Sequence, residues 1–162
     1  MDGGHAKVLA IYLRPFWRER GLSGTVSSFV GPLAEIHDAS ALDGGAALFG
    51  FVGLGALDRQ VMIPEELITA SLAQFARLFG QEALEPAATY ALDWAQEPLT
   101  ATAADAQSVN GQPPLSRRSM EALLKLNVIA SGTETAVEHR GYLEGAVEAA
   151  EYALHAYFGD KR

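Results

Sequence analysis

The sequence predicts an α+β fold in which a mixed, mainly antiparallel sheet is flanked by helices. Three observations lead to this prediction. Four short apolar segments follow one another within the first 52 residues, a helical repeat starts at residue 63, and a second long helical pattern lies near the end of the chain. Closely spaced strands with short connections are typical of antiparallel pairing, and separate runs of strands and helices are typical of the α+β class.

The first predicted strands are apolar segments that end at turn residues. The segment 7–14 (KVLAIYLR) reads as a buried strand that ends at Pro15. Further strands are expected over 25–30, Leu33–Asp38 and Ala46–Val52. Since their connections are short, we expect the four strands to form an antiparallel meander.

A helix is expected to follow, and then one more strand. Pro64 suits a first helical turn, and Glu65 and Glu66 complement the helix dipole there. The apolar residues recur at helical spacing as far as Phe79, and Gly80 suits a C-cap. Residues 87–94 are expected to form a strand.

The remainder of the chain changes character. Residues 98–119 hold proline, glycine and small polar residues without periodicity, which predicts a long loop. A short helix over 119–125, a short buried strand over 128–130 and a long helix over 141–157 are expected after it. We expect one domain over 1–162, with a sheet-forming part (1–127) and a strand-helix part (128–162).

Composition excludes several classes of function. The 162 residues carry a net charge of -8, whereas a nucleic-acid or anionic-membrane surface needs a basic patch. No apolar run reaches the ~18 residues of a membrane span. The chain has no cysteine, which excludes thiolate chemistry and fits a cytoplasmic location. Its four histidines lack metal-ligand spacing, so no metal is expected.

Some polar residues have plain structural interpretations. His37 next to Asp38 is expected to be a polar pair at the edge of a loop rather than a catalytic pair. Glu144, Glu148 and Glu151 recur at helical spacing and are expected to form a solvated helix face.

Two neighbouring motifs near the C-terminal end carry the strongest functional signal. They read SGTETA over 131–136 and GYLEGAVE over 141–148. This pattern resembles the C-terminal signature of flavin-containing amine oxidases, the family of monoamine oxidase and putrescine oxidases. A glycine turn before a helix N-terminus also suits pyrophosphate or the flavin ring, although a plain strand-turn-helix is the alternative.

The resemblance assigns roles to these residues. It implies that Gly132, Thr133 and Glu134 lie along the ribityl-pyrophosphate of FAD. It also implies a second group at the flavin ring, formed by Gly141, Tyr142 and Leu143. Tyr142 would be one wall of an aromatic cage that orients the amine, and is therefore a candidate catalytic residue.

Lys7 is the other candidate catalytic residue. It lies ten residues before Trp17 of the segment Pro15-Phe16-Trp17. A lysine at this spacing from a P-F-W motif is similar to the family lysine that holds a water at flavin N5. The alternative is a strand-edge lysine whose ammonium group reaches solvent.

A third segment, YALDWAQEPLT over 90–100, resembles the family motif that precedes the flavin-linking cysteine. Ala103 stands at that cysteine's position, so FAD would be bound non-covalently. Ala104 replaces an aromatic cage residue, which weakens the substrate site. The resemblance also implies a substrate cavity lined by Phe49, Phe51 and Trp94.

The family's N-terminal Rossmann unit with its G-x-G-x-x-G motif is absent from this sequence. We therefore expect no binding site for the adenine half of FAD. Three hypotheses stay open: an oxidoreductase subunit completed by an FAD-binding partner chain, which deaminates a small amine; a truncated, non-catalytic homodimer or oligomer without flavin; and a module that binds a small ligand. Whether the chain is an enzyme by itself is left open.

Overall fold

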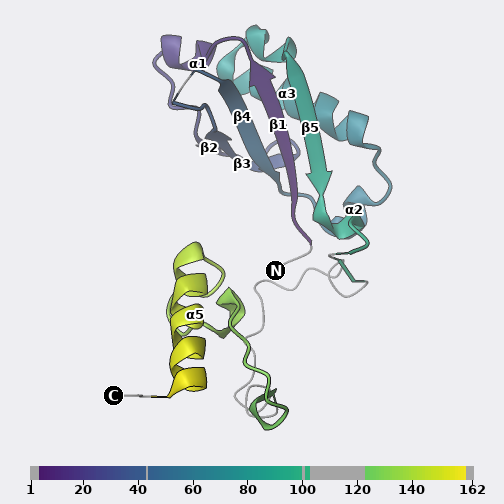
Figure 1. The fold of residues 1–162 in the computed structure, drawn as a ribbon. Coiled ribbons are helices and arrows are strands. Elements are labelled where there is room, and N and C mark those ends of the chain that lie inside the picture. Colours follow the sequence, from purple (N-terminus) through teal and green to yellow (C-terminus); the bar gives the residue numbers. More distant parts are fainter. Residues whose placement is uncertain (1–3, 43, 100, 103–122, 160–162) are drawn as a thin grey trace. The chain divides into compact units, whose positions relative to one another are not determined.

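The computed structural model describes residues 4–42, 44–99, 101–102 and 123–159, shown as coloured ribbon in Figure 1. The chain divides into two compact units, Asp2–Ser108 and Val109–Arg162. The sequence suggested a change of character at 127/128 within one domain. A single domain over 1–162 therefore stays a prediction.

The N-terminal unit is built on a five-stranded sheet. Its strands are β1 (Ala6–Tyr12), β2 (Val26–Ser27), β3 (Leu33–Asp38), β4 (Ala46–Val52) and β5 (Ala88–Asp93). Their order in the sheet is β2-β3-β4-β1-β5, and every pair is antiparallel. This confirms the α+β class.

The expected four-stranded meander is wrong in one respect. Strands β2, β3 and β4 do follow one another, but β1 lies between β4 and β5 (Figure 1). In this interior position β1 pairs with β4 along one edge and with β5 along the other, and every second residue faces the core. The predicted second strand is also shorter than expected, because only Val26–Ser27 pair.

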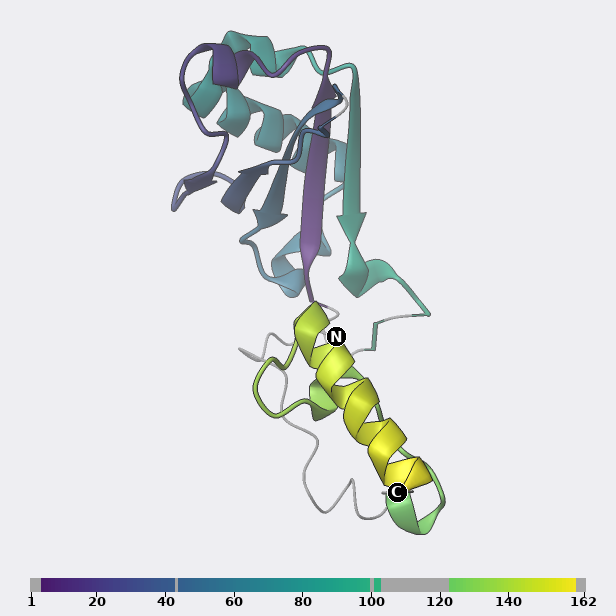
Figure 2. The ribbon, with the colours of Figure 1, turned by 60° about the vertical axis from the view of Figure 1, so that its left-hand side comes forward.

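The helices of this unit are α1 (Phe16–Glu19), α2 (Ala56–Arg59) and α3 (Pro64–Phe79). Helix α3 begins at the expected proline, and its C-cap is Gly80, whose φ of 110° favours glycine. Both ribbon views place α3 on one side of the sheet (Figure 1, Figure 2). Short 3-10 helices occupy Gln81–Leu84 and Trp94–Gln96.

The core lies between α3, α1 and one face of the sheet. Its largest fully buried side chains include Trp17, Phe75, Leu48, Ile36 and Val8. Because side chains alternate along a strand, the buried set occupies one face only. The other face of the sheet carries Lys7, Phe49 and Phe51.

A buried amide joins α3 to β3. Gln74 is 1% exposed, and its Oε1 accepts a hydrogen bond from the Leu33 N–H at 2.9 Å. Its Nε2 donates to the Leu33 carbonyl at 2.8 Å. The register of β3 against β4 shifts between Leu33 and Glu35, and the amide pairs the backbone of Leu33 at that irregularity.

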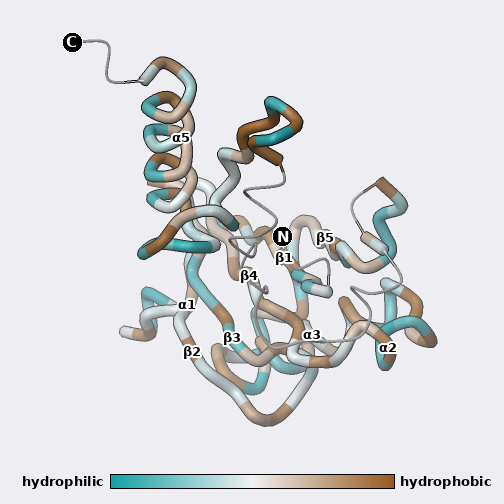
Figure 3. The backbone as a smooth tube through the Cα atoms, turned by 90° about the horizontal axis from the view of Figure 1, so that it is seen from below, coloured by the Kyte–Doolittle hydropathy of each residue, from teal (hydrophilic) through white to brown (hydrophobic). Residues whose placement is uncertain are grey.

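The C-terminal unit contains a 3-10 helix at Thr133–Thr135 and the long helix α5 (Leu143–Phe158). The predicted helix over 141–157 is thereby confirmed. Residues 123–125 are helical, whereas the rest of the expected helix over 119–125, and most of the loop over 98–119, lie outside the described residues. Figure 3 shows hydrophobic and hydrophilic stretches alternating along α5.

The predicted buried strand over 128–130 is wrong. These residues have no regular secondary structure, and Val128 is exposed. A strand requires a hydrogen-bonded neighbour, and the described residues of this unit contain no other strand. Local apolarity alone therefore does not produce a strand here.

Candidate functional site

The face of the sheet opposite the core, which we call the open face, carries Lys7. It is defined by Lys7 and Leu9 on β1, Phe49 and Phe51 on β4, Glu35 and His37 on β3, and Tyr90 and Leu92 on β5. Cross-strand pairing aligns these residues in two rows. One row runs Glu35, Phe51, Lys7, Leu92, and the other runs His37, Phe49, Leu9, Tyr90.

Aromatic rings cluster at the β3–β4 side of the open face. Phe49 and Phe51 meet edge to face with ring centroids 5.1 Å apart, and His37 stacks on Phe49 at 5.3 Å. Lys7 Nζ lies 5.0 Å from the centroid of the Phe51 ring. The sequence-predicted residues Lys7, Phe49 and Phe51 are thus brought together on one surface.

His37 also lies on this face, a position that the sequence did not predict. The expected pairing with Asp38 is wrong, since successive strand residues point to opposite faces of the sheet. His37 Nε2 instead lies 3.5 Å from Glu35 Oε2, on the same face. The signal that could have found it was the two-residue spacing of Glu35 and His37 within a predicted strand.

The side chain of Asp38 is hydrogen-bonded to residues on the core side of the sheet. It accepts hydrogen bonds from Trp17 Nε1 at 2.7 Å and from Arg18 Nε at 2.6 Å. Burial raises the pKa of this carboxyl, but the hydrogen bonds from Arg18, Ser40 and Trp17 outweigh burial and hold its pKa well below its usual range. Asp38 is therefore a structural anion.

Trp94 lies apart from the aromatic cluster. It begins the 3-10 helix after β5 and is half-buried, and its backbone N–H donates to the His5 carbonyl at 3.0 Å. Within the described part of the chain, its ring makes no ring contact with Phe49 or Phe51. Its predicted place in the substrate cavity stays a prediction.

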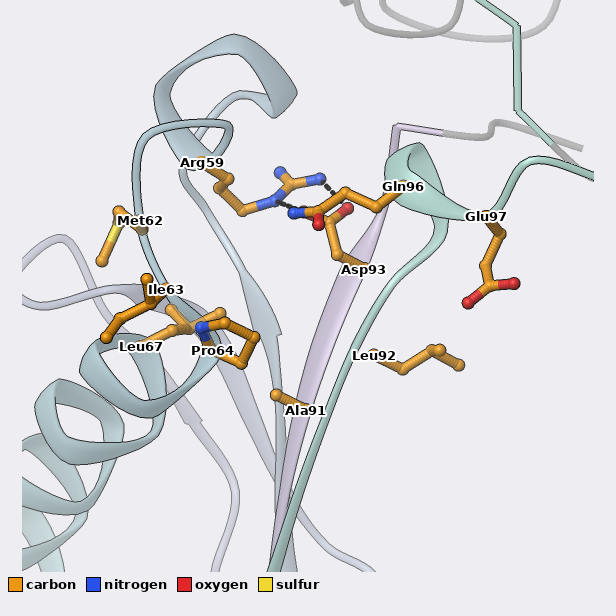
Figure 4. A pocket seen from close by; sticks show the side chains of 10 residues that line it. All are labelled: Arg59, Met62, Ile63, Pro64, Leu67, Ala91, Leu92, Asp93, Gln96 and Glu97. Carbon is orange, nitrogen blue, oxygen red and sulfur yellow. Dashed lines mark hydrogen bonds and ion pairs between the residues drawn. The ribbon is translucent and has the colours of Figure 1, made fainter.

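A cavity of about 190 Å³ opens beside β5 (Figure 4). One side is apolar and includes Met62, Ile63 and Leu67, and the other side holds Arg59 and Asp93, whose charged groups point toward one another. Arg59 is 3% exposed and also donates to the carbonyls of Leu54 and Gly4. Since the guanidinium is engaged within the protein, the pair is structural.

The motif residues of the C-terminal unit are tied together by one hydroxyl. Thr133 Oγ1 accepts a hydrogen bond from the Gly141 N–H at 2.8 Å and donates to the Tyr142 carbonyl at 2.9 Å. Gly132 and Glu134 flank Thr133 in sequence. The two halves of the predicted flavin-binding motif therefore meet at the N-terminal end of α5.

Close packing at this point depends on Gly145 in the first turns of α5. A Cβ at Gly145 would lie 2.0 Å from the His139 carbonyl oxygen and 2.8 Å from Thr133 Oγ1. Tyr142 and Leu143, by contrast, are 73% and 90% exposed in the structure. Two large side chains are thus exposed to solvent at the start of the helix.

Glu148 was expected on a solvated face of α5, and the structure contradicts this expectation. It is half-buried and accepts hydrogen bonds from the Val137 N–H at 2.7 Å and the His139 N–H at 3.5 Å. The Val137 hydrogen bond is the largest cause that holds the pKa of Glu148 below its ordinary value. Glu144 and Glu151 are exposed as expected.

A family model described as flavin containing amine oxidoreductase matches residues 3–153. This match covers most of the chain. The chain belongs to this amine oxidase family. Ala103 and Ala104, the two positions where the sequence departs from the family motif, lie outside the described residues.

Individual relatives agree with the family match. The chain is 31% identical over 163 residues to amine oxidase [flavin-containing] B of Rattus norvegicus, covering 95% of this chain and 31% of that protein. The structure of putrescine oxidase bound to putrescine matches with a TM-score of 0.70 and 27% identity, over 95% of this chain and 35% of the other. Cyclohexylamine oxidase from Brevibacterium oxydans IH-35A matches with a TM-score of 0.73 and 28% identity, over 94% and 34%.

The chain therefore spans about a third of the length of these amine oxidases. The relatives are flavin-containing by name, so the family implies FAD in the full-length proteins. Of the helices in the described part of the chain, none has the length and apolarity needed to cross a membrane. The described residues also hold no group of three or more His, Asp or Glu side chains suited to a metal ion.

Proposed function

We propose that this chain is the substrate-side part of an FAD-dependent amine oxidase of the cytoplasm, completed by a separate FAD-binding chain. The complex would oxidise a small amine to an imine. Membership of the family supports the reaction class. The observation that carries the proposal is the open face, where Lys7, Phe49 and Phe51 meet on one surface.

The residues of the C-terminal unit fit a non-covalently bound flavin. Thr133 holds Gly141 and Tyr142 together at the start of α5, where no side chain caps the helix. Free N–H groups at a helix N-terminus suit a pyrophosphate or the electron-rich edge of a flavin. The exposed side chains of Tyr142 and Leu143 suit contact with a flat ring.

The chain's own residues would bind and orient the substrate. Bound FAD would supply the redox chemistry, because it accepts the two electrons removed from the amine. The ammonium group of Lys7 would hold a water molecule, and the ring of Tyr142 would orient the amine. Phe49 and Phe51 would contact the apolar part of the substrate and exclude bulk water from it.

Co-expression with a chain that bears G-x-G-x-x-G tests this proposal. The expected result is a yellow complex that absorbs between roughly 350 and 500 nm and turns over an amine. Expression of each chain alone is the control. A colourless mixture that oxidises no amine would contradict the proposed function.

A second candidate is a non-catalytic homo-oligomer without flavin, and the surface of α5 favours it. Four apolar side chains recur along this helix at spacings of about one or two turns, and all are exposed in the structure: Leu143, Val147, Leu154 and Tyr157. An exposed apolar stripe favours association with a second chain. Light scattering would then give a dimer or larger oligomer, and FAD would leave the melting temperature unchanged. A monomer whose melting temperature rises with FAD excludes this candidate.

A further inference from the structure

Lys7 and Phe51 are direct cross-strand partners on the open face. The register of β1 against β4 pairs them, and the side chains of such pairs lie close enough to interact. Lys7 Nζ lies 5.0 Å from the centroid of the Phe51 ring, within the range of a cation–π contact. The ring and the ammonium group are therefore in contact on this surface.

Three neighbouring rings restrict the ring of Phe51 in turn. Phe49 meets it at 5.1 Å with an interplanar angle of 72°, and His37 meets it at 6.2 Å and 85°. His5 meets it at 6.4 Å and 64°. Edge-to-face packing of this kind is a favoured arrangement of aromatic rings, so the ring under Lys7 has a defined orientation.

Among the described residues, no carboxylate forms an ion pair with Lys7. The nearest acid in the same row is Glu35, the partner of Phe51 on its other side, and Glu35 approaches His37 instead. An aromatic face attracts an ammonium group without accepting its N–H groups in the way a carboxylate does. Among the described residues, none accepts a hydrogen bond from the Lys7 ammonium group, so its three N–H donors can bind a water or a ligand.

We propose that Phe51 is a positioning residue for Lys7, rather than only a wall of the substrate cavity. The ring holds the ammonium group on the open face and leaves its donors available. The role given to Lys7 rests on the proposed function, whereas the contact with Phe51 can be tested on this chain alone.

The test is nuclear magnetic resonance of the full chain. The ring current of Phe51 is expected to move the ε-methylene protons of Lys7 upfield of those of Lys125, and a nuclear Overhauser effect should join them to the Phe51 ring. Phe51→Leu should abolish both signals and Phe51→Tyr should restore them. Tyr90→Leu, which removes a ring of the same face that pairs with Leu9, should leave both signals unchanged.

Lys7 signals that coincide with those of Lys125 in the wild type would overturn the inference. So would an unchanged upfield shift in Phe51→Leu with the amide signals of Val8 and Ala10 intact. If Phe51→Leu unfolds, the Overhauser effect and the Phe51→Tyr variant decide. If the complex is yellow and active but the Lys7 signals show no upfield shift, only the inference about Phe51 is refuted. If the shift is present but the complex is colourless and inactive, only the proposed function is refuted.

Discussion

Arg59 and Asp93 form a two-pronged ion pair that joins the end of α2 to the end of β5. Arg59 Nε donates to Asp93 Oδ2 at 2.9 Å, and Nη2 donates to Oδ1 at 2.7 Å. The side chains are 3% and 14% exposed. Because 34 residues separate the two positions, the pair connects distant segments of the N-terminal unit.

Asp93→Asn is expected to destabilise the N-terminal unit by about 3 kcal/mol, because it leaves a buried guanidinium without its counter-ion. Chemical denaturation followed by circular dichroism measures this loss. Arg14→Met is the matched control, since Arg14 is an exposed partner of Glu19 and Glu82, and its midpoint should stay near that of the wild type. Equal midpoints for Asp93→Asn and the wild type would refute a stabilising role.

Acid should weaken the wild type more than Asp93→Asn. Burial raises the pKa of Asp93, but the hydrogen bonds from Arg59 and Ala95 outweigh it and hold its folded-state pKa below the ordinary value. The unfolded chain therefore binds the proton first as pH falls, and the contribution of Asp93, complete above about pH 4, is lost as the pH falls toward the folded-state pKa. Unfolding free energies at a series of acidic pH values test this, and parallel curves for both proteins would contradict it.

Thr133→Val should weaken the hydrogen bonding that holds the predicted flavin-binding motif together, because valine has nearly the same size as threonine but lacks the hydroxyl. The variant removes the hydrogen bonds to the Gly141 N–H and the Tyr142 carbonyl, each worth about 1 kcal/mol. Hydrogen exchange at the Gly141 amide is expected to become faster, while exchange in β1 is unchanged. Thr133→Ser keeps the hydroxyl and should retain protection. Equal exchange in the valine and serine variants would show that the hydroxyl does not organise this turn.

Lys7→Met should separate catalysis from flavin binding in the complex with an FAD-binding chain. If Lys7 holds a water as proposed, the loss of its donors should lower kcat on the order of 100-fold. The visible absorption of the flavin should be retained. Lys125→Met removes an exposed lysine of the C-terminal unit and serves as the control. Unchanged kcat in Lys7→Met would exclude the proposed role.

Elements defined by local signals were predicted closely from the sequence. Strands β3 and β4 and helix α3 begin and end where the apolar pattern, Pro64 and Gly80 place them. The motif over 131–148 identified the family, which the family model then confirmed. The same local reasoning erred at 128–130, where an apolar segment has no strand beside it.

The sequence by itself determined the family, the α+β class and the residue types available for chemistry. Hydrophobic periodicity, helix caps and short motifs depend on residues close together in the sequence, so they can be recognised from a single sequence. Tertiary structure decided the position of β1 between β4 and β5, the Arg59–Asp93 pair, and the contacts of the Phe51 ring with Lys7 and His37. Those relationships join residues distant in sequence, and they arise only when strand pairing and burial select one register and one buried face of the sheet.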